Sequence, residues 1–159
     1  MRFTKMHGVG NDFIILDPEE VAGRDLPGLA RKACDRHFGV GADGILIPAS
    51  SEVADLRMVY LNSDGSPSEM CGNGLRCLVH YAKDRGMVKG DAMTVATGAG
   101  ETLASGSGSC AAAVAAVRRG LVGSPVRVVL DGGVVEVEWE GESVYMMGPA
   151  EYVCEGQLL

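Results

Sequence analysis

The sequence has few positive charges and contains no long apolar run. There are 14 Lys and Arg residues against 21 Asp and Glu residues, which gives a formal net charge of -7 at pH 7. Because Lys and Arg form no cluster that could neutralise phosphates, we expect no nucleic-acid partner. No apolar run approaches the roughly 20 residues needed to span a bilayer, and the N-terminal residues do not have a signal-peptide pattern. We therefore expect no membrane association and a cytoplasmic protein.

The cysteines have neither the spacing of a metal site nor the even number of a disulfide framework. The chain contains 5 cysteines, and none of them forms a C-x-x-C pair. Free thiols in a reduced compartment fit this pattern better than disulfides, and we expect no metal ion. The cysteines are Cys34, Cys71, Cys77, Cys110 and Cys154.

Length and composition are those of an ordinary globular protein. The chain has 159 residues, of which 47% are hydrophobic, and its mean hydropathy is +0.13. This is enough for one domain with a sizeable core or for two very small ones.

One short motif occurs twice, as CGNG at residues 71–74 and as SGSG at residues 105–108. Each copy runs into an apolar stretch typical of a helix. Glycines at a helix start expose backbone N–H groups, and the helix dipole favours an anion there. A thiol at such a position ionises more readily than usual, whereas a serine hydroxyl does not ionise at neutral pH. The repeat predicts two facing half-sites that hold a carboxylate.

Apolar periodicity and turn residues predict an α+β protein with mostly antiparallel strands. The sequence from His7 to Asp12 is typical of a turn or tight loop, and residues 98–108 are too glycine-rich to assign. The predicted helices are residues 26–38, 74–85 and 109–119, and the predicted strands are residues 2–6, 13–17, 44–47, 56–61, 93–96, 126–130, 134–139 and 144–147.

Three motifs in the same order resemble those of diaminopimelate epimerases. They are KMHGVGNDF at residues 5–13, NSDG at 62–65 with EMCGNGLRC at 69–77, and GETLASGSG at 100–108; MGPA at 147–150 also resembles the family. The resemblance covers nearly the whole chain. It implies an isomerase that interconverts LL- and meso-diaminopimelate for lysine and cell-wall synthesis without pyridoxal phosphate or any other cofactor. It also implies two similar lobes, each a barrel-like sheet around a helix, with the active site between them.

The resemblance assigns a role to both copies of the repeated motif. Inverting an amino-acid Cα without an imine cofactor requires a base on one face and an acid on the other, and a thiolate and a thiol can serve in either direction. Cys71 matches one catalytic thiol of the family, and Ser105 occupies the second catalytic position, where the family has cysteine. The residues that match substrate-binding positions are Asn11, Asn62, Gly72, Asn73, Gly106 and Ser107.

The chain is much shorter than other family members. Thr97 directly precedes GAGET, although in the family a long segment of the second lobe comes before that motif. Residues 95–101 therefore resemble the end of the first lobe joined to the final part of the second. We predict a first lobe over residues 1–97, a partial second lobe over 98–149, and a segment over 150–159 that returns to the first lobe.

Two rival hypotheses stand beside an epimerase of reduced activity. One is a non-catalytic remnant or engineered fragment that at most binds an amino acid, as a homodimer that completes its second sheet. The other is an ordinary enzyme from which an internal stretch is absent here and in which serine replaces cysteine to trap a ligand. Ser105 could also be a simple N-cap residue, and Asn11 and Asn62 could serve only to form turns.

Overall fold

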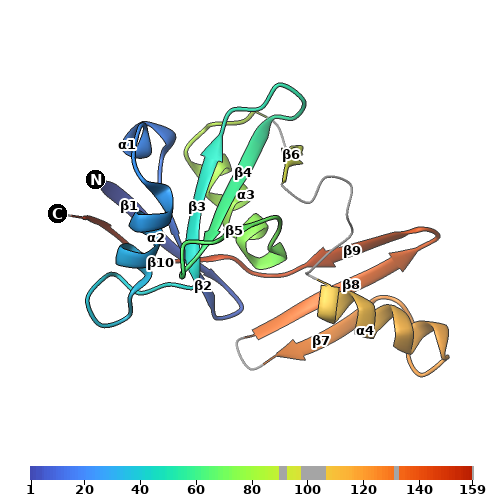
Figure 1. Ribbon diagram of the computed structural model, residues 1–159. Helices are drawn as coiled ribbons and strands as arrows, with labels where there is room; N and C mark the ends of the chain where they lie inside the picture. The colour runs from blue at the N-terminus through green and yellow to red at the C-terminus, as the bar shows by residue number, and fades with distance from the viewer. Residues whose placement is uncertain (90–92, 98–106, 131–132, 159) are drawn as a thin grey trace.

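The computed structural model describes residues 1–89, 93–97, 107–130 and 133–158. Within these residues seven strands form one mixed sheet in the order β10-β1-β2-β3-β4-β5, with β6 also paired to β4, and three strands form a second sheet in the order β7-β8-β9 (Figure 1). Helices accompany both sheets, so the predicted α+β class is confirmed. The strands are β1 (Arg2–Gly8), β2 (Asn11–Ile15), β3 (Gly44–Ala49), β4 (Leu56–Asn62), β5 (Pro67–Ser68), β6 (Val95–Ala96), β7 (Val126–Leu130), β8 (Gly133–Glu140), β9 (Ser143–Met147) and β10 (Glu151–Gln157), and the helices are α1 (Pro18–Val21), α2 (Leu26–Cys34), α3 (Gly72–Asp84) and α4 (Ser107–Arg118).

The first hairpin is tighter than the sequence suggests. Strands β1 and β2 are joined by Val9 and Gly10 alone, which have φ angles of 56° and 83°. Positive φ at both central residues is typical of the two-residue turn that matches the twist of paired strands. The predicted turn between the two strands is present but shorter than residues 7–12, because β1 extends to Gly8 and β2 begins at Asn11.

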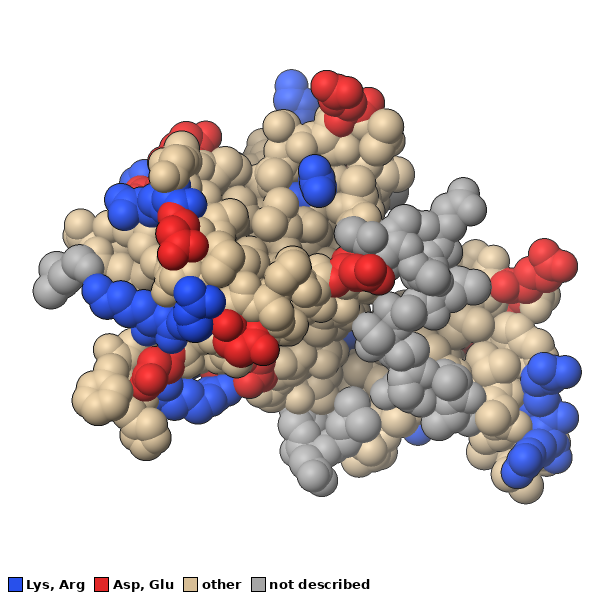
Figure 2. Space-filling model, in the orientation of Figure 1, with Lys and Arg blue, Asp and Glu red and all other residues tan. Residues whose placement is uncertain are grey.

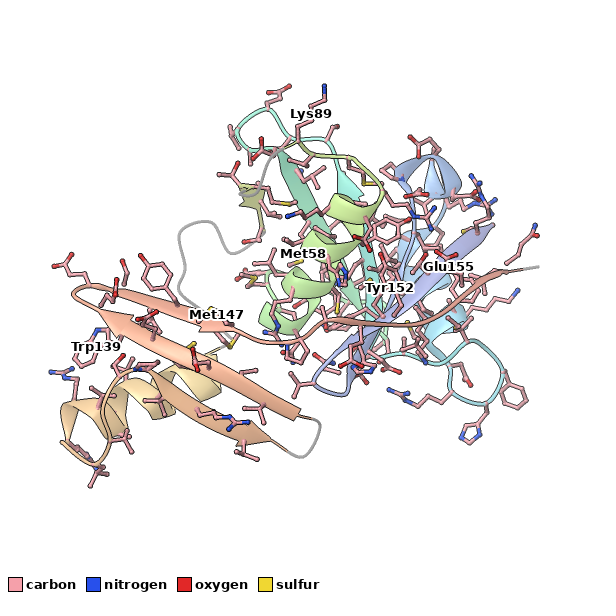
Figure 3. All side chains as sticks on the ribbon, turned by 180° about the vertical axis from the view of Figure 1, so that it is seen from behind. Met58, Lys89, Trp139, Met147, Tyr152 and Glu155 are labelled. Carbon is pink, nitrogen blue, oxygen red and sulfur yellow. The ribbon has the colours of Figure 1, made fainter. Side chains whose placement is uncertain are left out.

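The seven-stranded sheet separates two apolar clusters. Along β2, Ile14 faces the helices α1 and α2, whereas Phe13 and Ile15 face α3. Figures 1 and 3 show α3 on the opposite side of this sheet from α1 and α2. Each fully buried side chain of this size contributes about 1.5–3 kcal/mol relative to an exposed one. The stability of the sheet therefore depends on helices on both faces.

Helix α2 ends at Cys34, four residues before the predicted end at Phe38. The carboxylate of Asp35 accepts the backbone N–H groups of His37 at 2.7 Å and Phe38 at 2.8 Å, which turns the chain away from the helix. The Phe38 side chain is 93% exposed as a result. An aspartate that bonds to the following backbone thus ends the helix before its apolar pattern does.

The second sheet packs on α4 and exposes its other face. Val135 and Val137 of β8 are buried, whereas Tyr145 and Met147 of β9 are about half exposed. None of the helices within the described ranges is long and apolar enough to cross a membrane.

The chain ends with a strand that the sequence did not predict. Strand β10 pairs antiparallel with β1 of the first sheet, and Figure 3 shows it running back across the molecule from the second sheet. Its residues EYVCEGQ are mostly exposed and do not alternate between apolar and polar, so they lack the pattern of a half-buried strand. The predicted lobe boundaries stay a prediction.

Candidate active site

The ends of three neighbouring strands meet at one edge of the first sheet. Asn11 is the first residue of β2, and Gly44 is the first residue of β3, which runs parallel to β2. Strand β4 is antiparallel to β3, and its last residue, Asn62, lies opposite Gly44. The register therefore brings Asn11 and Asn62 to the same edge, although 51 positions separate them in the sequence.

Cys71 lies at this edge because helix α3 begins there. It has extended backbone angles, with φ −146° and ψ 116°, and it is the N-cap residue of α3. Its carbonyl oxygen accepts the Leu75 N–H at 2.7 Å, the first bond of the helix. The half-buried Cys71 Sγ donates to Asn11 Oδ1 at 3.5 Å, and Asn73 Nδ2 donates to the same oxygen at 3.3 Å. The structure thus joins three of the predicted site residues.

The start of α3 lies directly against β1. A Cβ atom on Gly8 would come within 3.1 Å of the Asn73 carbonyl oxygen, which is tighter than nearly all Cβ contacts, so glycine suits the close approach of the strand and the helix. The first N–H groups of a helix have no partner within the helix, and at α3 they lie beside Cys71. This arrangement can hold a carboxylate next to the thiol.

The side-chain amide of Asn11 is held from both sides. Its Nδ2 atom donates to Asp43 Oδ2 at 2.5 Å, while its Oδ1 atom accepts from Cys71 and Asn73. The side-chain oxygen of Asn11, Oδ1, therefore faces the Cys71 thiol.

Asp43 belongs to a compact group of charges beneath Asn11. Arg36 binds both carboxylate oxygens of Asp12, at 2.8 and 3.1 Å, and also Asp43 Oδ1 at 2.7 Å. Lys5 Nζ lies 2.9 Å from Asp12 Oδ2. Burial favours the neutral carboxyl of Asp12, but the hydrogen bonds from Arg36 and Lys5 outweigh it and lower the pKa of Asp12 to about 2. The Asp12 and Asp43 carboxylates likewise raise the pKa of Arg36.

Asn62 reaches the same edge, but its amide bonds within its own turn. Its Nδ2 atom donates to Ser66 Oγ at 3.0 Å, and its backbone N–H donates to the Ser66 carbonyl at 2.9 Å. Asp64 Oδ1 in turn accepts from the Ser66 hydroxyl at 2.6 Å. The structure thus places Asn62 at the same edge as the other site residues. Among the described residues, no hydrogen bond joins Asn62 to Cys71.

Arg76 is a residue of this region that the sequence interpretation did not select. Its Nη2 atom donates to Asn73 Oδ1 at 2.7 Å and its Nη1 atom to the Gly72 carbonyl at 3.4 Å. Its Nε atom donates to the Pro149 carbonyl at 3.4 Å, which connects α3 to the chain that follows β9. Burial lowers the pKa of Arg76. The available signal was its position three residues after Asn73, on the same face of a helix.

The second copy of the motif lies largely outside the described residues. This applies to Ser105 and Gly106, and to the side chain of Ser107, which is the first residue of α4. Helix α4 confirms the predicted helix after the second motif, with a start at Ser107 instead of residue 109. The roles of Ser105, Gly106 and Ser107 stay predictions.

The remaining cysteines differ from Cys71 in their surroundings. Burial raises the pKa of Cys34 and of Cys77 to about 12, so both thiols stay protonated at neutral pH and serve as packing residues. Burial also raises the pKa of the half-buried Cys110, whereas Cys154 is exposed.

Charges of both signs are mixed over the first sheet in Figure 2. Lys and Arg side chains lie next to Asp and Glu side chains over the first sheet and its helices. Two hollows of about 550 and 560 Å³ are lined by residues away from the Cys71 edge, which include Phe38 and Leu158 in one and Asp17 and Arg85 in the other.

The arrangement of strands and helices matches that of a solved protein of very different sequence. A solved methylitaconate-delta-isomerase has a similar fold, with a TM-score of 0.55 and 15% identity over 100% of this chain and 93% of the other. At that identity the similarity shows the fold alone.

The sequence comparisons identify the family. The model of the diaminopimelate epimerase family matches residues 3–101 and 96–153, so the chain belongs to this family and the resemblance is confirmed. A diaminopimelate epimerase from Pelotomaculum thermopropionicum is 32% identical over 275 residues, which include 99% of this chain and 98% of the relative. One from Caldanaerobacter subterraneus is 56% identical over 100 residues, or 63% of this chain.

The same comparisons locate an internal difference in length. The alignment with the Pelotomaculum relative extends over 275 residues, whereas this chain has 159, so a large internal part of that relative has no counterpart here. The Caldanaerobacter match covers only 36% of that relative. The two segments matched by the family model share residues 96–101, which lie at the junction predicted from the sequence.

Proposed function

We propose that the chain is an amino-acid epimerase of the diaminopimelate type that works by proton transfer on opposite faces of Cα, with reduced turnover. The observation that carries the proposal is the Cys71 thiol at the N-cap of α3, bonded to Asn11 Oδ1 beside the free N–H groups of that helix. In this role Cys71 exchanges a proton with Cα while the helix start holds the adjacent carboxylate.

The substrate-binding residues of the first half surround this thiol. Gly72 and Asn73 supply backbone donors at the start of α3, and Asn11 and Asn62 supply amides from the strand ends. A diaminopimelate molecule carries an α-carboxylate, which needs hydrogen-bond donors, and an α-ammonium group, which needs acceptors. The residues around Cys71 offer both kinds of group. A Cys71 thiolate that takes the α-proton and a Ser105 hydroxyl that returns one on the opposite face account for both proton transfers, so the proposed reaction uses neither a metal ion nor pyridoxal phosphate.

Ser105 takes the opposite position, with Gly106 and Ser107 as the second pair of donors. A serine hydroxyl is a far weaker acid and base than a thiol, and each tenfold loss of rate corresponds to about 1.4 kcal/mol of barrier. The second half also lacks the internal part of the longer relatives. Both differences point to slow turnover.

Incubation with LL-diaminopimelate in D2O tests the proposal. We expect slow formation of the meso epimer with deuterium at Cα. Loss of the α-proton without any epimer would mean that Cys71 acts alone and returns deuterium to the same face. The absence of both, in a sample shown to be folded by circular dichroism, would refute an enzymatic role.

A Ser105→Cys variant separates the two causes of slow turnover. If the missing internal part limits the reaction, the variant shows no recovery, which is our expectation. Recovery to the rate of a full-length relative would identify the serine as the limiting change.

The second candidate is a protein that binds the amino acid without turnover, as a homodimer that completes the second sheet. The exposed Tyr145 and Met147 on the uncovered face of that sheet favour a dimer, because a second copy would bury them. Native mass spectrometry and calorimetric titration with diaminopimelate check it: a dimer that binds the ligand but exchanges no proton would support this candidate over the first.

A further inference from the structure

The side-chain amide of Asn11 could rotate by half a turn without any change in the backbone. Its hydrogen-bond partners, however, favour only one of the two orientations. An asparagine amide presents a donor at one end and an acceptor at the other. In this structure the donor end points to Asp43 and the acceptor end to Cys71. Which end faces the thiol matters, because a carbonyl oxygen accepts a bond from a thiol whereas an NH2 group would donate one to a thiolate.

Asp43 determines the orientation from one side. Its Oδ1 atom accepts from Arg36 at 2.7 Å, and its Oδ2 atom accepts the backbone N–H of Asp12 at 3.1 Å. An ionised carboxylate only accepts hydrogen bonds. Asn11 must therefore turn its NH2 group toward Asp43, whose own position is held by a guanidinium and a backbone amide.

Arg76 determines the orientation from the other side. A guanidinium only donates, so the oxygen of the Asn73 amide faces Arg76 at 2.7 Å. This leaves the NH2 group of Asn73 for the oxygen of Asn11, at 3.3 Å. The two sets of contacts agree, and both place the Asn11 oxygen beside Cys71.

We propose that Asp43 is a positioning residue: by binding the NH2 group of Asn11 it directs the Asn11 carbonyl oxygen to Cys71 and so favours the protonated thiol over the thiolate. A bound molecule that displaces the Asn11 oxygen would release the Cys71 Sγ hydrogen from this bond. The catalytic meaning of this step depends on the proposed function, but the state of the thiol does not, because it can be measured without turnover.

An Asp43→Asn variant tests the proposal. The new side chain has one acceptor oxygen in place of two, so it cannot serve Arg36 and the Asn11 NH2 group together. Asn73 then orients the Asn11 amide alone, and the Asn11 NH2 group is free to turn toward Cys71. We expect the rate of Cys71 alkylation by iodoacetamide at pH 7 to rise about fivefold, the ratio that one ordinary hydrogen bond provides. Peptide mass spectrometry reads Cys71 separately, and the exposed Cys154 is the internal reference, with an unchanged rate.

The same substitution in an Asn11→Ala background separates orientation from charge. Loss of the Asp43 charge alone would favour the thiolate with or without Asn11, whereas the proposed effect requires the Asn11 amide. We expect Asp43→Asn to leave the Cys71 alkylation rate unchanged in the Asn11→Ala protein. An equal increase in both backgrounds would overturn the proposal.

A measurement on the unmodified protein covers the case in which a variant does not fold. The NH2 protons of Asn11 should show nuclear Overhauser contacts to the Asp12 amide proton, since both groups donate to Asp43 Oδ2. Stronger contacts to the β-protons of Cys71 would show the opposite orientation and refute the proposal. Alkylation and Overhauser data that agree with the proposal, together with no proton exchange on diaminopimelate, would refute the proposed function alone.

Discussion

At the residue scale, the site depends on side chains that their hydrogen-bond partners hold in one orientation. Asn11 is the central residue, because it joins the thiol of Cys71 to the carboxylate of Asp43. Asp43 is in turn bound by Arg36, which also holds Asp12. The reactive group and the charges below it therefore form one connected network, and changes to single members should be measurable.

Replacement of Cys71 by serine should remove the chemistry proposed for this edge. A positioned acid or base contributes about 10²–10⁴-fold to proton transfer, so the rate of α-proton exchange should fall by that factor. Proton NMR of diaminopimelate in D2O measures it. Cys154→Ser is the matched control, because this thiol is exposed and lies on β10. An undiminished rate in the Cys71 variant would assign the exchange to another group.

Asp12 should make stability depend on pH in the acid range. Because its pKa is about 2 in the folded protein, below the ordinary 3.8, its stabilisation is complete above about pH 4 and is lost as the pH falls through about 2. Asp12→Asn should lower the free energy of unfolding by about 2 kcal/mol at pH 7, with a smaller difference from the native protein at pH 2. Urea unfolding at several pH values measures this.

The exposed Glu52 provides the control for that experiment. Glu52→Gln should leave the free energy of unfolding within about 0.5 kcal/mol of the native value. A difference between native protein and Asp12→Asn that stayed constant down to pH 2 would show that the ion pairs of Asp12 contribute nothing to the acid transition.

At the element scale, helix α3 carries the site because it begins at the sheet edge and packs over β1 and β2. Its buried residues Leu78 and Tyr81 lie in the cluster on that face, and its N-cap residue is Cys71. The start of the helix lies so close to Gly8 that a Cβ atom there would make a tight contact of 3.1 Å with the Asn73 carbonyl oxygen. Packing of the helix and position of the thiol are thus linked.

A Gly8→Ala variant should disturb this contact. The new Cβ would lie 3.1 Å from the Asn73 carbonyl oxygen, so the start of α3 must shift. We expect a loss of about 1–3 kcal/mol in the free energy of unfolding, as for other overpacked sites. Gly123→Ala is the control, because a Cβ there meets nothing within 4 Å. Equal stability of the two variants, measured by thermal unfolding, would contradict the close contact.

At the scale of the whole molecule, the two sheets are supported unequally. Helices cover both faces of the central strands of the first sheet, whereas β7, β8 and β9 pack on α4 and leave Val129 and Tyr145 exposed. Strand β10 returns from the second sheet to pair with β1. Arg76 adds a hydrogen bond from α3 to the Pro149 carbonyl along this return.

Hydrogen exchange should reveal this difference. The backbone amides of β1 to β4 should exchange slowest, because they lie between two apolar clusters, and those of β7 to β9 should exchange faster, because local opening of that sheet exposes little buried surface. Mass spectrometry of exchanged peptides measures both groups. Equal protection would show instead that the two sheets open as one cooperative unit.

The sequence predicted much of the fold but fewer of the contacts at the site. Helical periodicity predicted α2, α3 and α4, although the hydrogen bonds of Asp35 end α2 early. The motif at residues 71–74 predicted the thiol at a helix start, which the structure has at Cys71. Asp43 was not selected because only the pairing of β2 with β3 brings it to Asn11. Arg76 was not selected although it lies three residues after Asn73 on the same helix.

The sequence by itself determined the family and the reactive groups: glycine-flanked Cys71, the amides of Asn11, Asn62 and Asn73, and a serine at position 105, since each of these is a matter of residue type and order. Only the tertiary structure decided which way those groups point. The parallel pairing of β2 with β3 brings Asp43 under Asn11, and the start of α3 brings Cys71 above it. Hydrogen bonds are directional, so the orientation of the Asn11 amide follows from this geometry, which no local pattern of residues encodes.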